Sequence, residues 1–214
     1  LRGEKLGGIC MTEPNAGSDL GKMTTRARLA ADGSHSLISG SKNFITCPDA
    51  DVMVVLAREE SDYEATKGST KGISMFMVPK RLPDGSVNSV RPERLEEKMG
   101  IHGSATAVLL FEDAVGYLIG KVGAGMKQMF EMMNLARLAV AYQALGIAQN
   151  QYWLALAYAR EREQFEGRFH GPIINIPAVA ELLLNMRTRL EALRALLYDA
   201  AVETEKVKAM EARG

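Results

Sequence analysis

The sequence lacks several features that would each point to a particular class of protein. No apolar run among its 214 residues approaches the roughly 20 residues needed to cross a bilayer, and the first residues lack the basic-then-apolar pattern of a signal peptide. Neither sign of charge is in excess, because Lys plus Arg and Asp plus Glu both number 26. Without a net field, neither nucleic acid nor an anionic membrane is favoured as a partner. We therefore expect a cytoplasmic protein, or one of an organelle matrix after processing.

Cysteine is scarce, and metal-binding patterns are missing. The two cysteines, Cys10 and Cys47, have no metal-ligand spacing, and each stands in an apolar or turn context without a basic run beside it. We therefore expect both thiols to be structural and no metal to be bound.

Hydrophobic residues are plentiful, at 47% of the chain, which provides enough core for one or two domains. The sequence begins at Leu1 rather than at a methionine and stops at Gly214, just after a long helical pattern. We expect it to be part of a larger protein.

Residues 1–118 have the pattern of a β domain. Apolar and charged residues alternate over 25–29 before the hairpin signal Asp32-Gly33, and short apolar runs follow over 37–38, 51–56, 72–78 and 105–111. This spacing predicts a small antiparallel barrel or sandwich. The polar stretches 59–71 and 80–98 are expected to be long exposed loops or hairpin tips.

Residues 119–214 have a helical pattern instead, so the fold class is α+β. One helix is predicted from Met126 to about residue 163 and a second from Pro177 to about residue 205, and the short connection makes them an antiparallel pair. The first half of the first helix is apolar nearly all round. We therefore expect the pair to be part of an incomplete helical bundle, with further helices from outside this chain or from another subunit.

Residues 9–21 form the most informative stretch, Ile-Cys-Met-Thr-Glu-Pro-Asn-Ala-Gly-Ser-Asp-Leu-Gly. Pro14 favours an extended Glu13, while Asn15 and Gly17 can occupy turn positions that most residues avoid. Several N–H groups and hydroxyls can then converge on an electron-rich heterocycle or a phosphate. By composition alone a surface turn is the alternative. The order of the residues, Met-Thr-Glu-Pro followed by Ala-Gly-Ser-Asp, resembles the signature of the acyl-CoA dehydrogenases.

The resemblance implies a flavin site, with FAD as the cofactor. Met11 and Thr12 would contact the pyrimidine edge of the flavin through backbone and hydroxyl, and Ser18 would lie between the flavin and CoA. Donors at that edge stabilise the negative charge that the ring gains on reduction.

A second matching stretch is Gly-Ser-Lys-Asn-Phe-Ile-Thr over 40–46. The resemblance implies that Phe44 covers one flavin face, that Ile45 contributes backbone, and that the Thr46 hydroxyl lies near flavin N5. Many family members have Trp where this chain has Phe44. By itself, the Ile-Thr pair is also typical of an ordinary strand.

The resemblance also implies substrate and subunit contacts. Ser104, in the stretch 98–106, would lie near CoA, and Asn134 with Arg137 would face the substrate from the long helix. On physical grounds Arg137 could equally form a salt bridge to another helix. Arg162 and Phe165 resemble the Arg-x-x-Phe that reaches the FAD of a neighbouring subunit, although Arg162 could also simply oppose the helix dipole. The extra residues after Phe165 depart from the family pattern.

The activity that the resemblance implies is α,β-desaturation of an acyl-CoA, with hydride transfer to flavin N5 and an electron-transfer flavoprotein or similar acceptor. Most members carry the glutamate that abstracts the α-proton beyond the point where this chain stops, so we expect the base outside it. A homodimer or homotetramer is implied, and the wording of the motifs is nearest to the subfamily that includes 3-methylmercaptopropionyl-CoA dehydrogenases. The alternatives are an acyl-CoA oxidase or flavin monooxygenase of the same fold, or a non-catalytic flavin- or DNA-binding relative.

Overall fold

The computed structural model describes residues 3–165 and 170–211. They belong to two compact units, Leu1–Glu131 and Met132–Gly214, and each is described here by itself. The expected boundary between residues 118 and 119 stays a prediction.

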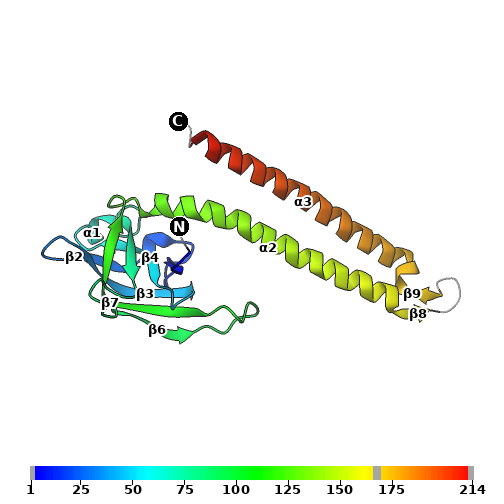
Figure 1. Ribbon diagram of the computed structural model, residues 1–214, viewed down its shortest axis with the longest axis horizontal. Coiled ribbons are helices and arrows are strands. Elements are labelled where there is room, and N and C mark those ends of the chain that lie inside the picture. The colour runs from blue at the N-terminus through cyan, green and yellow to red at the C-terminus, as the bar shows by residue number, and fades with distance from the viewer. Residues whose placement is uncertain (1–2, 166–169, 212–214) are drawn as a thin grey trace. The chain divides into compact units, whose positions relative to one another are not determined.

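The first unit is a closed β-barrel (Figure 1). Its wall follows the order β4, β2, β3, β7 and β5, and pairing of β5 with β4 closes the ring. The bounds of these strands are Val52–Glu59, Arg26–Leu29, Ser36–Thr46, Thr106–Ile119 and Ile73–Pro79, in the same order. Two more strands extend the wall, because β1 (Gly7–Cys10) pairs with β4 and β6 (Val90–Leu95) pairs with β7.

The barrel is not purely antiparallel, which corrects the expectation. Both β1 and β2 run parallel to β4, whereas the remaining pairs are antiparallel. The sequence shows only a period of two, which is the same for both directions of pairing. The direction of β1 and β2 is set by the connections between strands.

The two stretches expected to be loops are more ordered than their polarity indicated. Residues 59–71 include the short helix α1 (Tyr63–Thr66), and the buried Arg58 side chain donates hydrogen bonds to the carbonyls of Thr66, Ser69 and Lys71. The second stretch, 80–98, contains the edge strand β6, so the expectation of a loop or hairpin tip was wrong over Val90–Leu95. Most β6 side chains are exposed, so polarity hid the strand.

Helix α2 (Gly125–Glu161) starts close against strand β5. A side chain at Gly125 would place its Cβ 2.7 Å from the Ser74 carbonyl carbon, so only glycine allows this approach. The Ser74 hydroxyl also accepts the Gly123 N–H at 2.9 Å. These contacts hold the first residues of α2 against β5.

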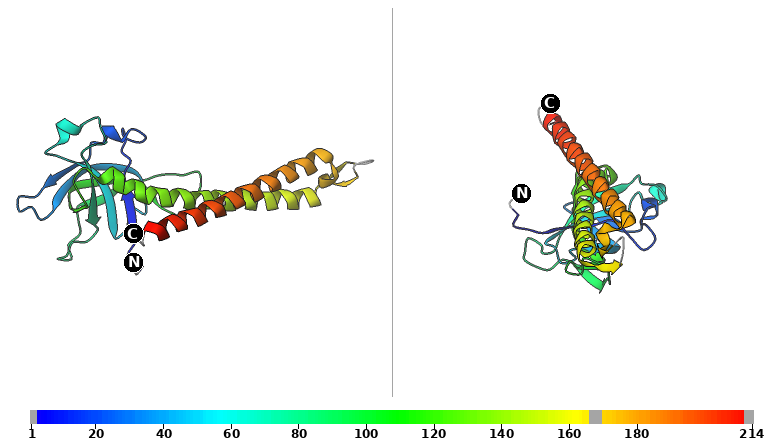
Figure 2. Two further views of the ribbon diagram at one scale, coloured as in Figure 1. Left: turned by 90° about the horizontal axis from the view of Figure 1, so that it is seen from above. Right: turned by 90° about the vertical axis from the view of Figure 1, so that its right-hand side faces the viewer.

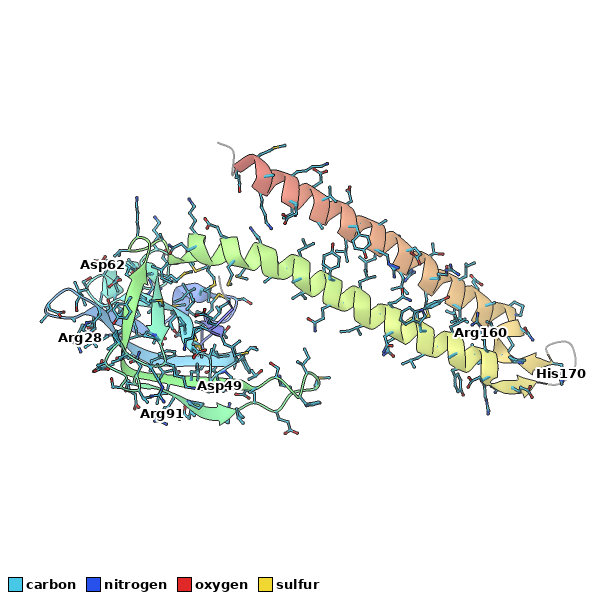
Figure 3. The ribbon with its side chains drawn as sticks, viewed as in Figure 1. Arg28, Asp49, Asp62, Arg91, Arg160 and His170 are labelled. Carbon is cyan, nitrogen blue, oxygen red and sulfur yellow. The ribbon has the colours of Figure 1, made fainter. Side chains whose placement is uncertain are left out.

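The second unit is an antiparallel pair formed by α2 and α3 (Pro177–Glu211), as predicted (Figures 1 and 2). The short strands β8 (Glu163–Phe165) and β9 (Gly171–Pro172) and the 3₁₀ turn η3 (Ile173–Asn175) join them. Figure 3 places Arg160 and His170 at this end of the pair. The buried seam repeats every seven residues, with Leu145, Tyr152 and Ala159 packing with Leu183, Leu190 and Leu197.

Much apolar surface of the pair remains exposed. More than half of the side chain is exposed at several large residues of both helices, namely Val140, Ile147, Trp153, Leu154, Leu182, Leu184 and Leu196. This surface is consistent with the expected further helices, which stay a prediction. Among the described residues, no helix is long and apolar enough to cross a membrane.

Candidate functional site

The structure brings the two principal motifs together at one end of the barrel. Met11 and Thr12 follow directly on β1, and the Thr12 carbonyl accepts the backbone N–H of Asn43 on β3 at 2.8 Å. Phe44, Ile45 and Thr46 follow Asn43 directly along β3. The Met11–Thr12 segment and the Phe44–Thr46 segment therefore share one edge.

A β-bulge determines which side chains this edge presents. Lys42 pairs with Leu109 and Ile45 with Ala107, so β3 has one more residue than β7 between these pairs. Phe44 takes up the extra residue with φ +59°, and its ring is 63% exposed. Regular alternation would have turned Phe44 to the same face as Lys42; instead Ile45 is buried and both Phe44 and Thr46 are exposed.

An unpartnered polar atom lies beside both motifs. A cavity of about 500 Å³ is bordered by Pro14 from the first motif, by Ser41 and Asn43 from the second, and by Arg94 of β6. The Asn43 Oδ1 atom is buried and has no hydrogen-bond partner among the described residues. A buried acceptor of this kind is costly unless a donor reaches it.

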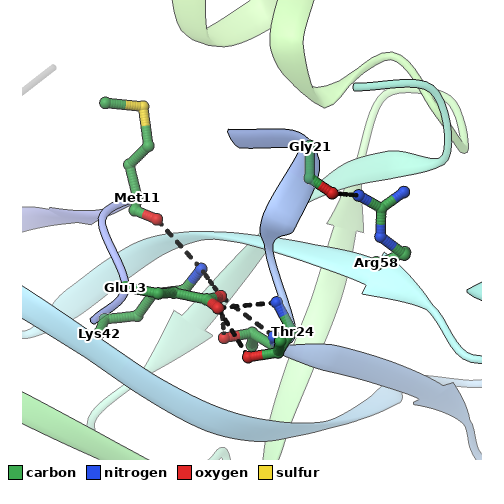
Figure 4. Close-up of polar contacts among 7 residues, drawn as sticks. Met11, Glu13, Gly21, Thr24, Lys42 and Arg58 are labelled. Atoms are coloured by element: carbon green, nitrogen blue, oxygen red, sulfur yellow. Dashed lines mark hydrogen bonds and ion pairs between the residues drawn. The ribbon is translucent and has the colours of Figure 1, made fainter. Parts of the chain in front are cut away.

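A buried ion pair, Glu13 and Lys42, lies next to Met11 (Figure 4). The Lys42 side chain is fully buried, with Nζ 2.8 Å from Glu13 Oε1 and 3.2 Å from the Met11 carbonyl oxygen. Burial lowers the pKa of Lys42, although the charge of Glu13 acts in the opposite direction. Desolvation would raise the pKa of Glu13, but the Lys42 charge and hydrogen bonds from Lys42, Thr25 and Thr24 together lower it to about 2.

Both oxygens of Glu13 have several donors. Oε2 accepts the backbone N–H and the hydroxyl of Thr24 at 2.7 and 2.8 Å, and Oε1 accepts those of Thr25 at 3.0 and 2.5 Å. The sequence motifs alone assign no role to Glu13 or Lys42. A signal was present, because Lys42 is in phase with Ser36 and Ile38, which are both buried on β3.

The cysteines have the buried surroundings of structural residues. Both are free thiols, and Cys10 belongs to the barrel core, where desolvation raises its pKa to about 12. Cys47 packs partly against the same core. Among the described residues no cluster of metal-ligating side chains is present.

Ser104 lies close to the second motif, and Ser18 lies on a separate turn. Ala105, next to Ser104, accepts the backbone N–H of Cys47 at 3.1 Å, so Ser104 is near the end of the Phe44–Thr46 segment. The Lys98 ammonium group holds this loop by donating to the carbonyls of Ile101 and Ser104. Ser18 is exposed in the turn that precedes the 3₁₀ turn η1 (Leu20–Lys22).

The remaining predicted residues belong to α2 and to the β8–β9 end of the second unit. Asn134 and Arg137 are exposed one helical turn apart, and Arg137 donates to the Asn134 side-chain oxygen at 3.0 Å. The Arg162 N–H donates to the Tyr158 carbonyl, and its own carbonyl accepts the Ile173 N–H. The side chain of Phe165 lies outside the described part of the chain.

The chain is of a class in which a small β-barrel, with two sequence motifs joined at one edge, is followed by a long helix pair. Residues 8–114 match the family model for the acyl-CoA dehydrogenase middle domain, and residues 123–213 match that for the acyl-CoA dehydrogenase C-terminal domain. The chain therefore belongs to the acyl-CoA dehydrogenase family.

Individual relatives agree with this assignment. The chain is 40% identical over 211 residues to 3-methylmercaptopropionyl-CoA dehydrogenase of Ruegeria pomeroyi, covering 92% of this chain and 35% of that protein. The structure resembles butyryl-CoA dehydrogenase from Megasphaera elsdenii with a TM-score of 0.81 at 33% identity, over 94% of this chain and 50% of that one. It also resembles acyl-CoA dehydrogenase complexed with FAD from Bacillus anthracis, with a TM-score of 0.75 at 32% identity. That match covers 89% of this chain and 31% of the other chain. The chain thus spans half or less of the length of these relatives.

Proposed function

We propose that this chain is part of an FAD-dependent acyl-CoA dehydrogenase that catalyses α,β-desaturation of an acyl-CoA thioester. The observation that carries the proposal is the hydrogen bond of 2.8 Å between the Thr12 carbonyl and the Asn43 N–H. It joins the two segments that the family resemblance assigns to one flavin. The family membership of the whole chain supports the same assignment.

The residues at this edge fit a flavin. Met11 and Thr12 are half-buried, while the Phe44 ring and Thr46 reach the surface, so hydroxyls, backbone and one aromatic face are available without a charged side chain among them. The Asn43 Oδ1 atom offers an acceptor to a donor from outside the protein. When bound, FAD would supply the two-electron acceptor that desaturation requires.

The chain's own residues would bind and orient the reactants. Thr12 and Thr46 would hold the flavin edge, Ile45 would contribute backbone, and Phe44 would exclude water from one face. Ser18 and Ser104 would contact CoA from the barrel. We assign Asn134 and Arg137 to the substrate and Arg162 and Phe165 to the FAD of a neighbouring subunit.

The proton-abstracting base is assigned to a glutamate outside these residues. At position 136, next to Arg137, the chain has alanine, which cannot abstract a proton. We further propose an electron-transfer flavoprotein as the acceptor and a homodimer or homotetramer as the assembly. The two free cysteines fit a reducing compartment such as the cytoplasm.

The test is the visible absorption spectrum of the full-length protein, recorded under anaerobic conditions before and after a panel of acyl-CoAs. We expect flavin bands that one thioester bleaches, and slow recovery of the bands in air without an added acceptor. Fast recovery in air would indicate an oxidase instead. A folded, colourless protein that added FAD cannot tint would contradict the proposal.

Substitutions at Thr12 and Thr46 test whether the flavin binds at this edge of the barrel. We expect Thr12→Val and Thr46→Val each to weaken FAD binding by about tenfold, since each removes one hydrogen bond to a polar ring. Thr70→Val is the matched control, because Thr70 is an exposed threonine in the loop after α1.

A further inference from the structure

The Glu13–Lys42 pair is buried more completely than stability alone explains. The exposed fractions of the two side chains are 2% and 0%. Removing two opposite charges from water costs several kcal/mol per ion, and hydrophobic replacements of such pairs are often neutral or stabilising. We therefore expect the pair to act on a neighbouring group that it contacts.

What it touches is the segment assigned to the flavin. Lys42 Nζ donates to the Met11 carbonyl at 3.2 Å, and Figure 4 shows this carbonyl directed at the amine while the Met11 side chain points away from it. The Met11–Thr12 peptide is trans, so its N–H points opposite to its C=O. The Thr12 N–H is therefore directed away from the buried pair.

The next peptide along the chain, Thr12–Glu13, is also held by a residue of β3. The Thr12 carbonyl accepts the Asn43 N–H at 2.8 Å, and Glu13 itself is held by Thr24 and Thr25. The carbonyls on both sides of Thr12 are thus engaged with β3. Within the described part of the chain the Thr12 N–H and hydroxyl have no hydrogen-bond partner, so both can reach a ligand at the edge.

We propose that Lys42 and Glu13 are positioning residues that aim and polarise the Thr12 N–H toward the bound flavin. Hydrogen bonds in a chain polarise one another, so an ammonium group on the Met11 carbonyl makes the N–H of the same peptide a stronger donor. Glu13 keeps the ammonium group in place without leaving an unpaired charge. The inference rests on the proposed function, because it assigns the pair's effect to FAD.

A stronger donor at the pyrimidine edge favours the reduced flavin, which carries more negative charge there. Removing the pair should therefore lower the reduction potential of the bound FAD. The affinity for oxidised FAD should change less than the affinity for reduced FAD. A merely structural role would change neither the ratio of these two affinities nor the reduction potential.

The experiment compares the full-length, FAD-loaded wild type with the double variant Glu13→Gln/Lys42→Met. Both charges are removed together, so no unpaired charge is left in the core; glutamine has the length of glutamate, and methionine is one atom shorter than lysine. We expect the preference for reduced over oxidised FAD to fall about tenfold, which is about 30 mV for a two-electron couple.

The control variant is Arg58→Met. Arg58 is also a fully buried cation of the barrel, and its donors reach the carbonyls of Gly21, Thr66, Ser69 and Lys71 rather than Met11. Its loss should leave the potential unchanged. An unchanged potential in the double variant would overturn the inference.

A measurement on the unmutated protein guards against a variant that does not fold. Amide hydrogen exchange at Thr12 should slow at least tenfold when the full-length apoprotein is loaded with FAD. Exchange at Thr12 that FAD does not slow would overturn the inference, while a yellow protein bleached by an acyl-CoA would leave the proposed function standing. A wild type that binds no FAD would contradict both the inference and the proposed function.

Discussion

Phe44 combines an unfavourable backbone with an exposed ring. Its φ of +59° lies in the left-handed region, which costs a non-glycine residue about 1–2 kcal/mol, and 63% of the side chain is in water. Because Phe44 is largely exposed, packing within the barrel does not offset this backbone cost. A ligand that stacks on the ring would offset it.

We predict that Phe44→Gly separates stability from cofactor binding. The free energy of unfolding of the apoprotein should change by no more than about 1 kcal/mol, since relief of backbone strain offsets the greater entropy of the unfolded chain. FAD affinity, measured by titration, should fall at least tenfold. Phe111→Ala is the control, because Phe111 is 1% exposed and its loss should destabilise by about 3–5 kcal/mol. Unchanged FAD affinity in Phe44→Gly would contradict the role given to the ring.

The Glu13 carboxylate predicts a particular loss of stability in acid. Its pKa is about 2 in the folded protein against 4.5 ordinarily, so the folded state binds the proton less well than the unfolded state. The resulting stabilisation, about 3 kcal/mol, is complete above pH 4.5 and is lost as the pH falls toward 2. Chemical unfolding of the full-length protein at several pH values should show this slope. The double variant Glu13→Gln/Lys42→Met should lack it, and an identical slope in both proteins would be evidence against the ion pair.

At the scale of elements, the helix pair depends on its seven-residue seam. Leu190 is 6% exposed and packs in the seam between α2 and α3. We predict that Leu190→Ala lowers the free energy of unfolding of the full-length protein by about 2–5 kcal/mol, through lost burial and a cavity. Asn185→Ala, an exposed change on the same helix, should cost less than about 0.5 kcal/mol. Equal effects of the two changes in thermal unfolding would mean that the seam is not what holds the helices.

For the chain as a whole, the lack of net charge and an exposed apolar stripe both bear on whether copies associate. The formal net charge is zero, so copies do not repel one another strongly. Leu182, Met186, Leu193 and Leu196 lie on one stripe of α3, and each is at least 36% exposed. An uncovered stripe of this kind favours association.

We therefore predict that the 214-residue chain, produced by itself, self-associates in sedimentation experiments. Replacing two leucines of the stripe, Leu182→Ser together with Leu196→Ser, should shift it toward the monomer. Glu181→Ser with Asp199→Ser is the control pair, because both residues are exposed and polar on the same helix. A chain that sediments as a monomer at every concentration would contradict the prediction.

Elements that depend on local pattern could be predicted from the amino-acid sequence. The antiparallel helix pair follows from apolar spacing and from Pro177, and the hairpin before β3 follows from Asp32-Gly33. The family was also readable, because the motifs at 9–21 and 40–46 are contiguous in sequence. These features need no knowledge of distant contacts.

Features that depend on strand pairing between distant segments could not be predicted from local pattern. The parallel direction of β1 and β2, the edge strand β6 and the bulge that turns Phe44 outward all follow from pairing with β4 or β7. The ion pair of Glu13 and Lys42 joins residues 29 positions apart and arises only when β1 and β3 lie together. A charged side chain is read from sequence as exposed, and it becomes a core residue only where the fold supplies its counter-ion.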